Sequence, residues 1–278
     1  MSLRYRKICK NPKTFHRLFG ITPQEFEIIV KKVEPRWHEK VISGYKRPGR
    51  DYKLDLSDMV LMLLLYYRSY VTQIFVGYMF GIDDSRVCRI IRRLEPILAS
   101  VMAIQKCKKL SKEEVESLMI DATEQPIERP KRRQKPYYSG KKKRHTLKTE
   151  IRVTGQGRIV HVSKSHPGST HDFTVFKGET RPPKESRLFV DSGYQGIADI
   201  HPHADFPYKA SKNTPLDAEE KAYNTALSRL RVKVEHIIGD LKTFKILADR
   251  YRNKRRRYCL KFNIIAGIVN LKNGFPAA

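Results

Sequence analysis

Cysteine is scarce in this chain of 278 residues, and the four that occur lie far apart: Cys9, Cys88, Cys107 and Cys259. No two of them form a Cys-x-x-Cys pair, and no histidine stands at ligand spacing from them. These absences argue against a disulfide framework and against a structural zinc site, and they favour a reducing intracellular environment.

Long hydrophobic stretches are missing as well. The longest apolar run extends from Met59 to Tyr67, which is nine residues, whereas a membrane-spanning helix needs about 20. The residues from Met1 to Lys7 are followed by no apolar segment that would indicate a signal peptide or an anchor. The sequence therefore predicts a cytoplasmic protein with no membrane partner.

Acidic residues are few relative to basic ones. The chain has 29 Asp and Glu against 56 Lys and Arg, which leaves a formal net charge of +27. Such a charge attracts polyanions, of which DNA and RNA are the commonest, whereas binding to an anionic membrane usually requires an apolar anchor as well. The length is sufficient for two domains of moderate size.

Two helices with clear starts are expected in the first hundred residues. Thr22-Pro-Gln-Glu25 combines an N-cap threonine, a proline at the first helical position and a glutamate that closes a capping box. Ser57 and Asp58 are expected to cap a second helix that continues to about Tyr66. Because this helix is apolar nearly all round, it is predicted to lie at the centre of its domain.

The segment from Gln73 to Arg92 has the spacing of a helix-turn-helix. Gly77 is small enough to let two helices approach, and Gly81 is placed for a left-handed turn before the helix start Asp83-Asp84-Ser85. A plain structural corner is the alternative, but the second helix carries a cationic face that suits phosphates and base edges, which favours DNA binding. The four arginines of this face are Arg86, Arg89, Arg92 and Arg93.

A compositional break at Ser111–Val115 places the domain boundary near residue 112, which divides the chain into residues 1–112 and 113–278. In the second part, Leu118–Asp121 and Leu188–Asp191 indicate strands that each end in an aspartate. The order of elements predicts an α/β layered sheet. The further elements are a β-hairpin of residues 144–154 and 158–163, a short helix starting at Gly168–Thr170, a strand at Phe206–Tyr208 and a long helix after Asp217.

Three acidic residues are candidates for a metal site. Asp121 and Asp191 stand at predicted strand ends, where α/β sheets usually carry their chemistry, and Glu235 would come from the long helix. Two Mg²⁺ (or Mn²⁺) ions would explain why acids converge in a basic protein, since such ions take oxygen ligands and activate phosphodiesters for attack. For each aspartate, the alternative is a strand-end residue that bonds to the following turn.

Other polar residues near these acids have simpler interpretations. Asp172 is a rival metal ligand, but its place in Ser169-Thr-His-Asp172 favours a helix-start cap. Glu124 and Glu128 are expected to be solvated. His171 and His236 are weaker candidates for orienting water or a metal ion.

The helix around Glu235 carries a stripe of charge. Arg231, Glu235 and Lys242 lie within roughly 40° of one another around the helix axis. An exposed helix with ordinary charge pairs is the alternative. Beside two strand-end aspartates, the stripe is better explained by a carboxylate for metal and two cations for DNA. The apolar face of the same helix is predicted to consist of Leu230, Val234, Ile237, Ile238 and Leu241.

Two stretches are strongly basic. Residues 129–148 contain ten Lys or Arg and no acid, and their tyrosines could stack on bases, so this stretch is predicted to follow a DNA backbone. Its central cations are Lys141, Lys142, Lys143 and Arg144. The second stretch, Arg250–Arg257, has six basic residues in eight, which DNA binding, targeting or plain solvation would explain equally well.

With these residues assembled, the sequence resembles the DDE transposases of bacterial insertion sequences, specifically the insertion sequence five family. The matching motifs cover the second half almost continuously, and the first half resembles that family's helix-turn-helix region. The motifs are Met119–Thr123, Tyr138–Lys148, Pro167–Phe176, Asp191–Gly196, Arg231–His236 and Gly239–Lys242.

The resemblance implies a ribonuclease-H-like catalytic domain in which Asp121, Asp191 and Glu235 form the DDE triad and bind two divalent metal ions. Arg231 and Lys242 match the Arg and Lys of the family signature around the glutamate. The tyrosine of that signature should stand three residues before the Arg, where this chain has Ser228, for which a weak phosphate contact is the most that is expected.

The implied function is that of a bacterial DNA transposase that acts in the cytoplasm at the nucleoid. Its first domain would bind the terminal inverted repeats of double-stranded DNA, and a homodimer or a larger assembly would pair the element ends. Metal-dependent hydrolysis would free 3′-OH ends, which would then join target DNA by transesterification. The alternatives are a catalytically idle DNA-binding regulator and a stand-alone structure-selective nuclease that cleaves without strand transfer.

Overall fold

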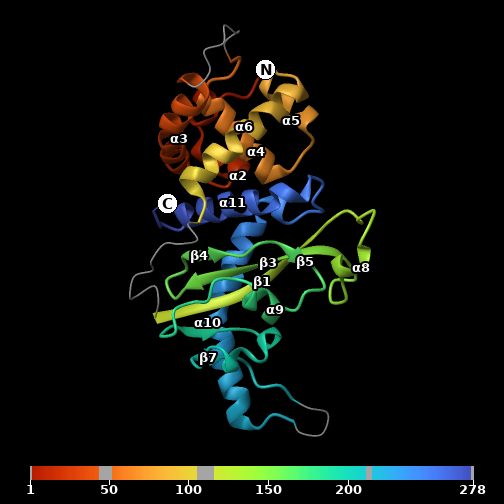
Figure 1. Cartoon of the computed structure of the whole chain (residues 1–278). Coiled ribbons are helices and arrows are strands. Elements are labelled where there is room, and N and C mark those ends of the chain that lie inside the picture. Colours follow the sequence, from red (N-terminus) through yellow and green to blue (C-terminus); the bar gives the residue numbers. More distant parts are fainter. Residues whose placement is uncertain (1, 44–51, 105–115, 211–214, 277–278) are drawn as a thin grey trace. The chain divides into compact units, whose positions relative to one another are not determined.

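The structure, a computed structural model, describes residues 2–43, 52–104, 116–210 and 215–276 (Figure 1). The chain divides into two compact units. The helical unit comprises Met1–Ala103, Lys242–Asp249 and Leu260–Ala278, and the sheet unit comprises Ile104–Leu241 and Arg250–Cys259. The predicted boundary near residue 112 lies outside the described residues and stays a prediction.

The helices of the helical unit begin at local side-chain caps. α3 (Pro23–Trp37) has the predicted capping box, in which Thr22 Oγ1 accepts a hydrogen bond from Glu25 N and the Glu25 carboxylate accepts one from Thr22 N. α4 (Leu56–Ser69) is capped by Asp55 instead of the predicted Ser57 and Asp58. The unit also contains α1 (Tyr5–Ile8), α2 (Pro12–Phe19), the π-helix η1 (His38–Ser43), α5 (Gln73–Phe80), α6 (Asp84–Met102), the 3-10 helix η4 (Lys245–Leu247) and most of α11 (Tyr258–Lys272).

α4 is the buried centre of the helical unit, as predicted. Its residues from Asp58 to Tyr67 are all buried, because an apolar surface all round lets neighbours pack on every side. α5 and α6 form the predicted corner. Gly81 has a φ of +69°, and a Cβ on Gly77 would lie 2.5 Å from the carbonyl oxygen of Ile82, so the corner requires glycine at both positions.

The C-terminal helix α11 packs within the helical unit, although the predicted division placed all of residues 113–278 in the catalytic domain. A side chain at Gly267 would overlap the carbonyl oxygen of Met102, so the two backbones approach closely there. Lys261 Nζ lies 2.9 Å from Glu95 Oε1, and both side chains are almost fully buried. A close backbone approach and a buried ion pair thus join α11 to α6.

The sheet unit is a mixed sheet with β1 at its centre. β1 (Ser117–Pro126) pairs antiparallel with β3 (Arg144–Thr154) and parallel with β6 (Arg187–Phe189), and β6 pairs parallel with β7 (Ala204–Asp205). β4 (Ile159–Val162) pairs antiparallel with β3 and completes the predicted hairpin. The short strands β2 (Tyr138–Ser139) and β5 (His166–Pro167) also join β3.

This order, with three antiparallel strands on one side and parallel strands on the other, is the ribonuclease-H-like arrangement, and the predicted fold class is confirmed. The strand predicted at Phe206–Tyr208 was wrong, because β7 ends at Asp205. The helices of this unit are α8 (Gln134–Tyr137), α9 (Asp172–Lys177) and α10 (Ala218–Lys242, whose last residue belongs to the helical unit), with the 3-10 helices η2 (Ser192–Tyr194), η3 (Ile197–Asp199) and η5 (Arg255–Arg257).

The long helix α10 begins directly after Asp217, as predicted, and crosses the sheet (Figure 1). Its predicted apolar face was wrong at Leu230, which is 50% exposed, and Leu227 is buried in its place. The core of the sheet unit includes a cluster of buried residues that joins β1, β6, α9 and the turns after β6. It consists of Leu118, Ile120, Phe176, Leu188, Val190, Tyr194 and Ile197.

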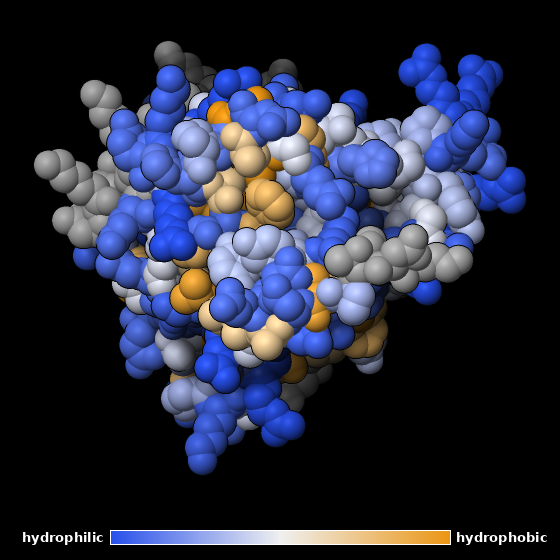
Figure 2. Space-filling model, turned by 90° about the horizontal axis from the view of Figure 1, so that it is seen from below, coloured by the Kyte–Doolittle hydropathy of each residue, from blue (hydrophilic) through white to orange (hydrophobic). Residues whose placement is uncertain are grey.

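The described helices include none that combines the length and the apolar character needed to cross a membrane. Figure 2 shows one face of the molecule, on which hydrophilic residues predominate and hydrophobic residues form only small areas. This surface agrees with the charged composition of the chain.

Candidate active site

Asp121 and Asp191 come from neighbouring parallel strands. Met119 of β1 pairs with Phe189 of β6. Asp121 stands two residues after Met119, and Asp191 stands two residues after Phe189. Asp191 follows the end of β6 as predicted, but Asp121 lies inside β1, which continues to Pro126, so its predicted place at a strand end was wrong. The parallel pairing therefore brings two carboxylates together that are far apart in the sequence.

The surroundings of Asp121 disfavour its charged form. Its side chain is 19% exposed, Oδ1 accepts a 2.8 Å hydrogen bond from Ala122 N, and Oδ2 lies 3.6 Å from Nη2 of Arg231 on α10. Burial raises the pKa of Asp121 to about 6 although Arg231 opposes the rise, and the charges of Asp191 and Asp172 add to it. A carboxylate in such a place gains from any cation that binds beside it.

The turn after Asp191 is closed by Asp191 itself. Its Oδ1 accepts a 2.6 Å hydrogen bond from Gly193 N, which is the turn-bonding role considered as the alternative to catalysis. A Cβ on Gly193 would lie 2.6 Å from Asp172 Oδ2 and 2.9 Å from Asp191 Oδ1. The absence of a side chain at Gly193 therefore lets two carboxylates approach the same peptide.

Asp172 belongs to this acidic group, and its interpretation as a helix cap was wrong. The N-cap of α9 is His171, and no side-chain cap bond forms there. The Asp172 carboxylate instead lies 2.7 Å from Nζ of Lys148, because β3 brings that lysine beside the start of α9. An ion pair thus determines the direction of this carboxylate.

Lys148 also connects a further acid. Its Nζ lies 3.7 Å from Glu124 Oε1, and the Glu124 side chain is only 9% exposed, so the expectation that Glu124 is solvated was wrong. Glu124 and Lys148 are directly paired residues of β1 and β3, which explains the contact. Glu128 is exposed, as expected.

Glu235 stands on α10 one helical turn after Arg231, and its side chain is exposed. Since Arg231 reaches Asp121, the helix stripe that carries Glu235 begins beside the aspartates. Within the described ranges, no three His, Cys, Asp or Glu side chains are grouped closely enough to hold a metal ion. The DDE triad stays a prediction in which Asp121 and Asp191 are neighbours and Glu235 is the outlying member.

The weaker candidates have varied positions. Ser228, His171 and His236 are exposed, and Lys242 is the last residue of α10 and belongs to the helical unit. The roles predicted for these four residues stay predictions.

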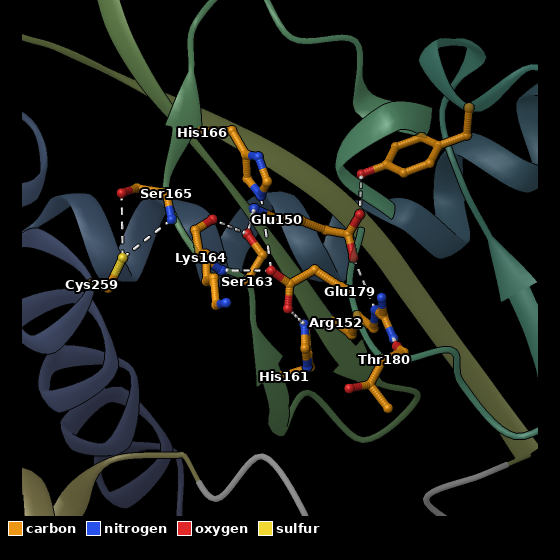
Figure 3. A network of polar contacts seen from close by, with 11 residues as sticks. Glu150, Arg152, His161, Ser163, Lys164, Ser165, His166, Glu179, Thr180 and Cys259 are labelled. Atoms are coloured by element: carbon orange, nitrogen blue, oxygen red, sulfur yellow. Dashed lines mark hydrogen bonds and ion pairs between the residues drawn. The ribbon is translucent and has the colours of Figure 1, made fainter. Parts of the chain in front are cut away.

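A network of buried polar side chains connects β3 to the turn after Asp191 (Figure 3). Glu150 Oε1 accepts a 2.9 Å hydrogen bond from Nε of Arg152, and both side chains are almost fully buried. Glu150 Oε2 accepts a 3.4 Å hydrogen bond from the hydroxyl of Tyr194. Burial raises the pKa of Glu150 to about 7 although Arg152 opposes the rise. The third residue after Asp191 is therefore held from inside the core.

The network continues into the segment after α9. Arg152 Nη1 donates a 2.5 Å hydrogen bond to the carbonyl oxygen of Thr180. The Glu179 carboxylate accepts a 2.8 Å hydrogen bond from Lys164 N and lies 3.3 Å from His161 Nε2, and Figure 3 shows these groups converging on it. Both ends of α9, which begins at Asp172, are thus fixed by charged side chains of β3 and its neighbours.

Sequence reasoning missed Lys148, Glu150 and Arg152. They stand at every second position of β3, so they share one face of the strand, and the strand is buried from Thr146 to Thr154. One signal was available in the sequence: charged residues stand at every second position of a segment expected to form a strand inside the sheet. Because buried charges must be paired, this pattern indicates a network of ion pairs.

The two basic stretches come together in the sheet unit. The Arg255 guanidinium lies 4.4 Å from the centroid of the Tyr137 ring, and Tyr251 N donates a 2.8 Å hydrogen bond to Pro126 O. The turn between β2 and β3, with the first residue of β3, adds four exposed cations, which makes one basic surface from distant parts of the sequence. These cations are Lys141, Lys142 and Lys143 of the turn and Arg144 of β3.

The four arginines predicted on the second helix of the corner are all exposed on α6. Arg86 Nε lies 3.2 Å from Asp83 Oδ2, and Arg89 bonds to the backbone and hydroxyl oxygens of Ser85. Arg92 and Arg93 follow one turn later. α6 thus carries a cationic surface at the corner of the helix-turn-helix.

Comparisons with known families identify both parts of the chain. Residues 120–270 match the model of a family described as DDE superfamily endonuclease. Residues 52–104 match the model described as the helix-turn-helix of DDE superfamily endonuclease, which confirms the predicted corner.

Two curated proteins are similar over most of the chain. One is "Probable transposase for insertion sequence element IS702" of Microchaete diplosiphon, which is 40% identical over 272 residues that cover 95% of this chain and 96% of that protein. The other is "Putative transposase for insertion sequence element IS112" of Streptomyces albus G, which is 26% identical over 233 residues that cover 83% and 84%. The narrower assignment to the insertion sequence five family stays a prediction.

Among solved structures, the Mos1 transposase paired-end complex with left transposon end covers 86% of this chain and 83% of its own. Its TM-score is 0.27 and its sequence identity is 11%, which is too distant to support a statement about this chain.

Proposed function

The chain belongs to the DDE superfamily of endonucleases and is a DNA transposase, and we propose that Asp121, Asp191 and Glu235 are its catalytic triad. The observation that carries the proposal is the pairing of β1 with β6, which brings Asp121 of β1 beside Asp191 just after β6, with Arg231 of α10 reaching the Asp121 carboxylate. Burial, with the charges of Asp191 and Asp172 added, raises the pKa of Asp121, and a charged carboxylate in that place destabilises the fold unless a cation binds it, so a catalytic role explains its presence.

DDE superfamily endonucleases generally depend on divalent metal ions. The three carboxylates fit this chemistry, because they offer only oxygen ligands, which Mg²⁺ and Mn²⁺ prefer. We infer that Asp121, Asp191 and Glu235 together hold two such ions. When bound, the ions polarise the scissile phosphate, lower the pKa of the attacking water or 3′-hydroxyl, and stabilise the leaving oxygen.

The cations of α10 have a separate role in the proposal. Arg231 lies beside Asp121, and within the described chain its buried Nε has no hydrogen-bond partner. Once another cation neutralises Asp121, Arg231 can donate to a DNA phosphate instead. Lys242 stands on the same stripe of α10, about 16 Å further along the helix, and would hold a different phosphate of the DNA backbone.

The proposed reaction has two displacement steps. Water attacks the phosphorus at an element end, the bond to the 3′ oxygen breaks, and a 3′-hydroxyl is left on the element. This hydroxyl then loses its proton and attacks a target phosphodiester, which releases a 3′ oxygen of the target strand. No covalent bond to the protein forms at either step.

The helix-turn-helix is proposed to read the terminal inverted repeats, and two protomers are proposed to pair the element ends. The site of action would be double-stranded DNA of the nucleoid in a bacterial cytoplasm. The basic surface of the sheet unit would hold the DNA backbone.

The proposal is tested with DNA that carries the terminal inverted repeats. Strand cleavage is expected to require Mg²⁺ or Mn²⁺, and Asp121→Asn and Glu235→Gln are each expected to reduce it by a factor on the order of 10³ or more. Glu219→Gln changes an exposed acid in the first turn of the same helix and serves as the control. Mn²⁺ binding, measured by electron paramagnetic resonance without DNA, should weaken in the two site variants and not in the control.

Three outcomes distinguish the alternatives. Cleavage retained by either site variant would refute the triad. DNA binding without any nicking in Mn²⁺ would indicate an idle regulator. Nicking without joining to a target plasmid would indicate a stand-alone nuclease.

A further inference from the structure

A groove of about 780 Å³ lies beside α6 in the helical unit, and neither the proposed triad nor its metal ions make use of it. One wall is the segment just before α4, and the other is one side of α6. Its lining consists of Tyr52, Lys53, Leu54, Arg86, Arg89, Ile90 and Arg93. The helix-turn-helix match, residues 52–104, includes both walls.

The rim of the groove is positively charged. Arg86, Arg89 and Arg93 are spaced by three and four residues, so they stand on one side of α6. Arg89 bonds to Ser85 oxygens and Lys53 Nζ donates a 2.7 Å hydrogen bond to Gly81 O, so uncharged oxygens hold these two cations in place. Fixed cations with neutral partners keep their charge available for an anion.

The floor of the groove is apolar and contains an aromatic ring. Leu54 is 2% exposed and Ile90 is 8% exposed, whereas Tyr52 is 41% exposed. The Tyr52 ring is fixed by an edge contact to Trp37 at 5.5 Å and by the Arg93 guanidinium, which lies 5.9 Å from its centroid and bonds to its hydroxyl. A site for phosphate alone would require the cations of the rim but not an apolar, aromatic floor.

The geometry points to a nucleotide site: we propose that the groove binds one unpaired nucleotide, with the base against Tyr52, Leu54 and Ile90 and the phosphate at the arginines. Nucleotides combine a planar apolar base with an anion, which matches floor and rim. A base inside a duplex is stacked on both faces and cannot enter. The inference rests on the proposed function only in taking DNA as the partner.

Arg92 provides an internal comparison. It is exposed on α6, but it stands about 100° around the helix from Arg93 and does not line the groove. Arg92 is therefore free to contact duplex DNA, while Arg89 and Arg93 serve the groove. The two functions are separable by single substitutions.

The test compares two probes that share one duplex carrying the terminal repeat, one fully paired and one with a three-nucleotide single-stranded overhang. Fluorescence anisotropy is measured in EDTA, so that failure of the catalytic proposal does not affect the result. The full chain is expected to bind the overhang probe about tenfold more tightly, which is the size of one base stacked on an aromatic ring. Tyr52→Ala should remove this preference and leave binding of the paired probe unchanged, whereas Arg89→Ala should weaken binding of the overhang probe more than binding of the paired probe.

Arg92→Ala is the matched control, and it should weaken binding of both probes by the same factor. A 2-aminopurine in the overhang gives a second readout, because its fluorescence should change on binding to the unaltered chain and to Arg92→Ala but not to Tyr52→Ala. Equal binding of both probes by the unaltered chain would overturn the proposal. So would an Arg89→Ala variant that loses both probes equally, which would make the groove part of the duplex contact.

The nucleotide could come from the DNA strand or from a free pool, and competition with dTMP separates these sources. Loss of the overhang preference at millimolar dTMP, with unchanged binding of the paired probe, supports a nucleotide site filled by the DNA strand. Tight dTMP binding together with equal affinity for both probes would assign the groove to a free nucleotide and overturn the inference for DNA.

Discussion

Each unit of this transposase contains a buried acid–base pair, and the two pairs differ in what surrounds them. In the helical unit, Lys261 of α11 pairs with Glu95 of α6, which also accepts a 3.1 Å hydrogen bond from Tyr67. In the sheet unit, Arg152 pairs with Glu150 two residues away on the same strand. The first pair joins two helices, whereas the second joins a strand to the candidate active site.

The environments of the pairs explain the difference. The Glu95 pair lies against the apolar helix α4 and its neighbours, and buried polar side chains are few in that unit. The Glu150 pair is part of a network that holds Tyr194, three residues after Asp191. Stability and function are therefore expected to be separable in the helical unit and coupled in the sheet unit.

The largest expected effect separates the activities of the two units. Asp191→Asn should reduce strand cleavage by a factor on the order of 10³ or more, because the amide cannot supply a second anionic ligand for the metal pair. Affinity for the terminal repeats should change less than twofold, since the helix-turn-helix is untouched. The measurements are cleavage in Mg²⁺ and anisotropy in EDTA, and Asp199→Asn, an exposed acid in η3, is the control. Equal losses of cleavage and repeat binding would contradict the separation.

The second largest effect is expected when the acid of each buried ion pair is removed. Glu95→Ala and Glu150→Ala should each lower the free energy of unfolding by about 3–5 kcal/mol, because each leaves a buried cation without its partner. Urea titrations measure this loss. Only Glu150→Ala should also slow cleavage per folded molecule, since it releases Tyr194. Equal specific activity of the two variants below their unfolding transitions would refute the coupling in the sheet unit.

A smaller effect is expected in the pH dependence of the free energy of unfolding, which tests the Glu150 network without removing its side chain. The pKa of Glu150 is about 7 in the folded chain, against about 4.3 in an unfolded one. The folded state therefore holds this proton more tightly, so Glu150 stabilises the fold below pH 4.3 and loses that contribution as the pH rises to 7. Between pH 5 and 8 the free energy of unfolding should therefore decline, and Glu150→Gln should remove roughly 2–3 kcal/mol of this decline.

The measurement is the difference between urea titrations of the unaltered and Glu150→Gln chains at pH 5, 6, 7 and 8. Asp121, whose pKa is raised to about 6, is present in both chains, so its own titration cancels in the difference. A difference that does not vary with pH would show that Glu150 is ionised throughout this range.

The same contrast explains what the sequence could predict. The capping box at Thr22, the buried helix α4 and the glycine corner followed from local patterns, because caps, periodicity and left-handed turns depend on neighbours in the chain. The hairpin of β3 and β4 was also correctly predicted from alternation and its glycine turn. None of these features depends on an ion pair between residues that are distant in the sequence.

The site was predictable only in its separate parts. Asp121 and Asp191 were identified from strand patterns and motifs, but the ion pair of Lys148 with Asp172 depends on β3 lying beside the start of α9. Local reasoning assigned Asp172 to a cap, since nothing near it in sequence shows the lysine. Likewise, the packing of α11 against α6 joins residues that are remote along the chain, so no boundary drawn by composition could include it.

The smallest expected effects come from two glycines that each allow a close approach, one in each unit. At Gly77 a Cβ would meet the carbonyl oxygen of Ile82 at 2.5 Å, and the backbone cannot yield easily. At Gly193 it would meet the carboxylates of Asp172 and Asp191, which can rotate. Gly77→Ala should therefore lower the free energy of unfolding by about 1–3 kcal/mol, whereas Gly193→Ala should lower it by less than about 1 kcal/mol.

Activity should show the reverse order for these glycines. Gly193→Ala displaces the two carboxylates beside the proposed metal ions, and a misplacement on the order of 1 Å can cost about a hundredfold in rate, so cleavage should fall by roughly 10- to 100-fold. Folded Gly77→Ala should retain the cleavage rate on DNA supplied at saturating concentration, because the substitution changes only the helix-turn-helix corner and saturating DNA compensates for weaker binding. Rates at saturating DNA and urea midpoints measure the two effects. If Gly193→Ala lost stability and kept its rate, the carboxylates near that peptide would be structural, and the sheet unit would resemble the helical unit after all.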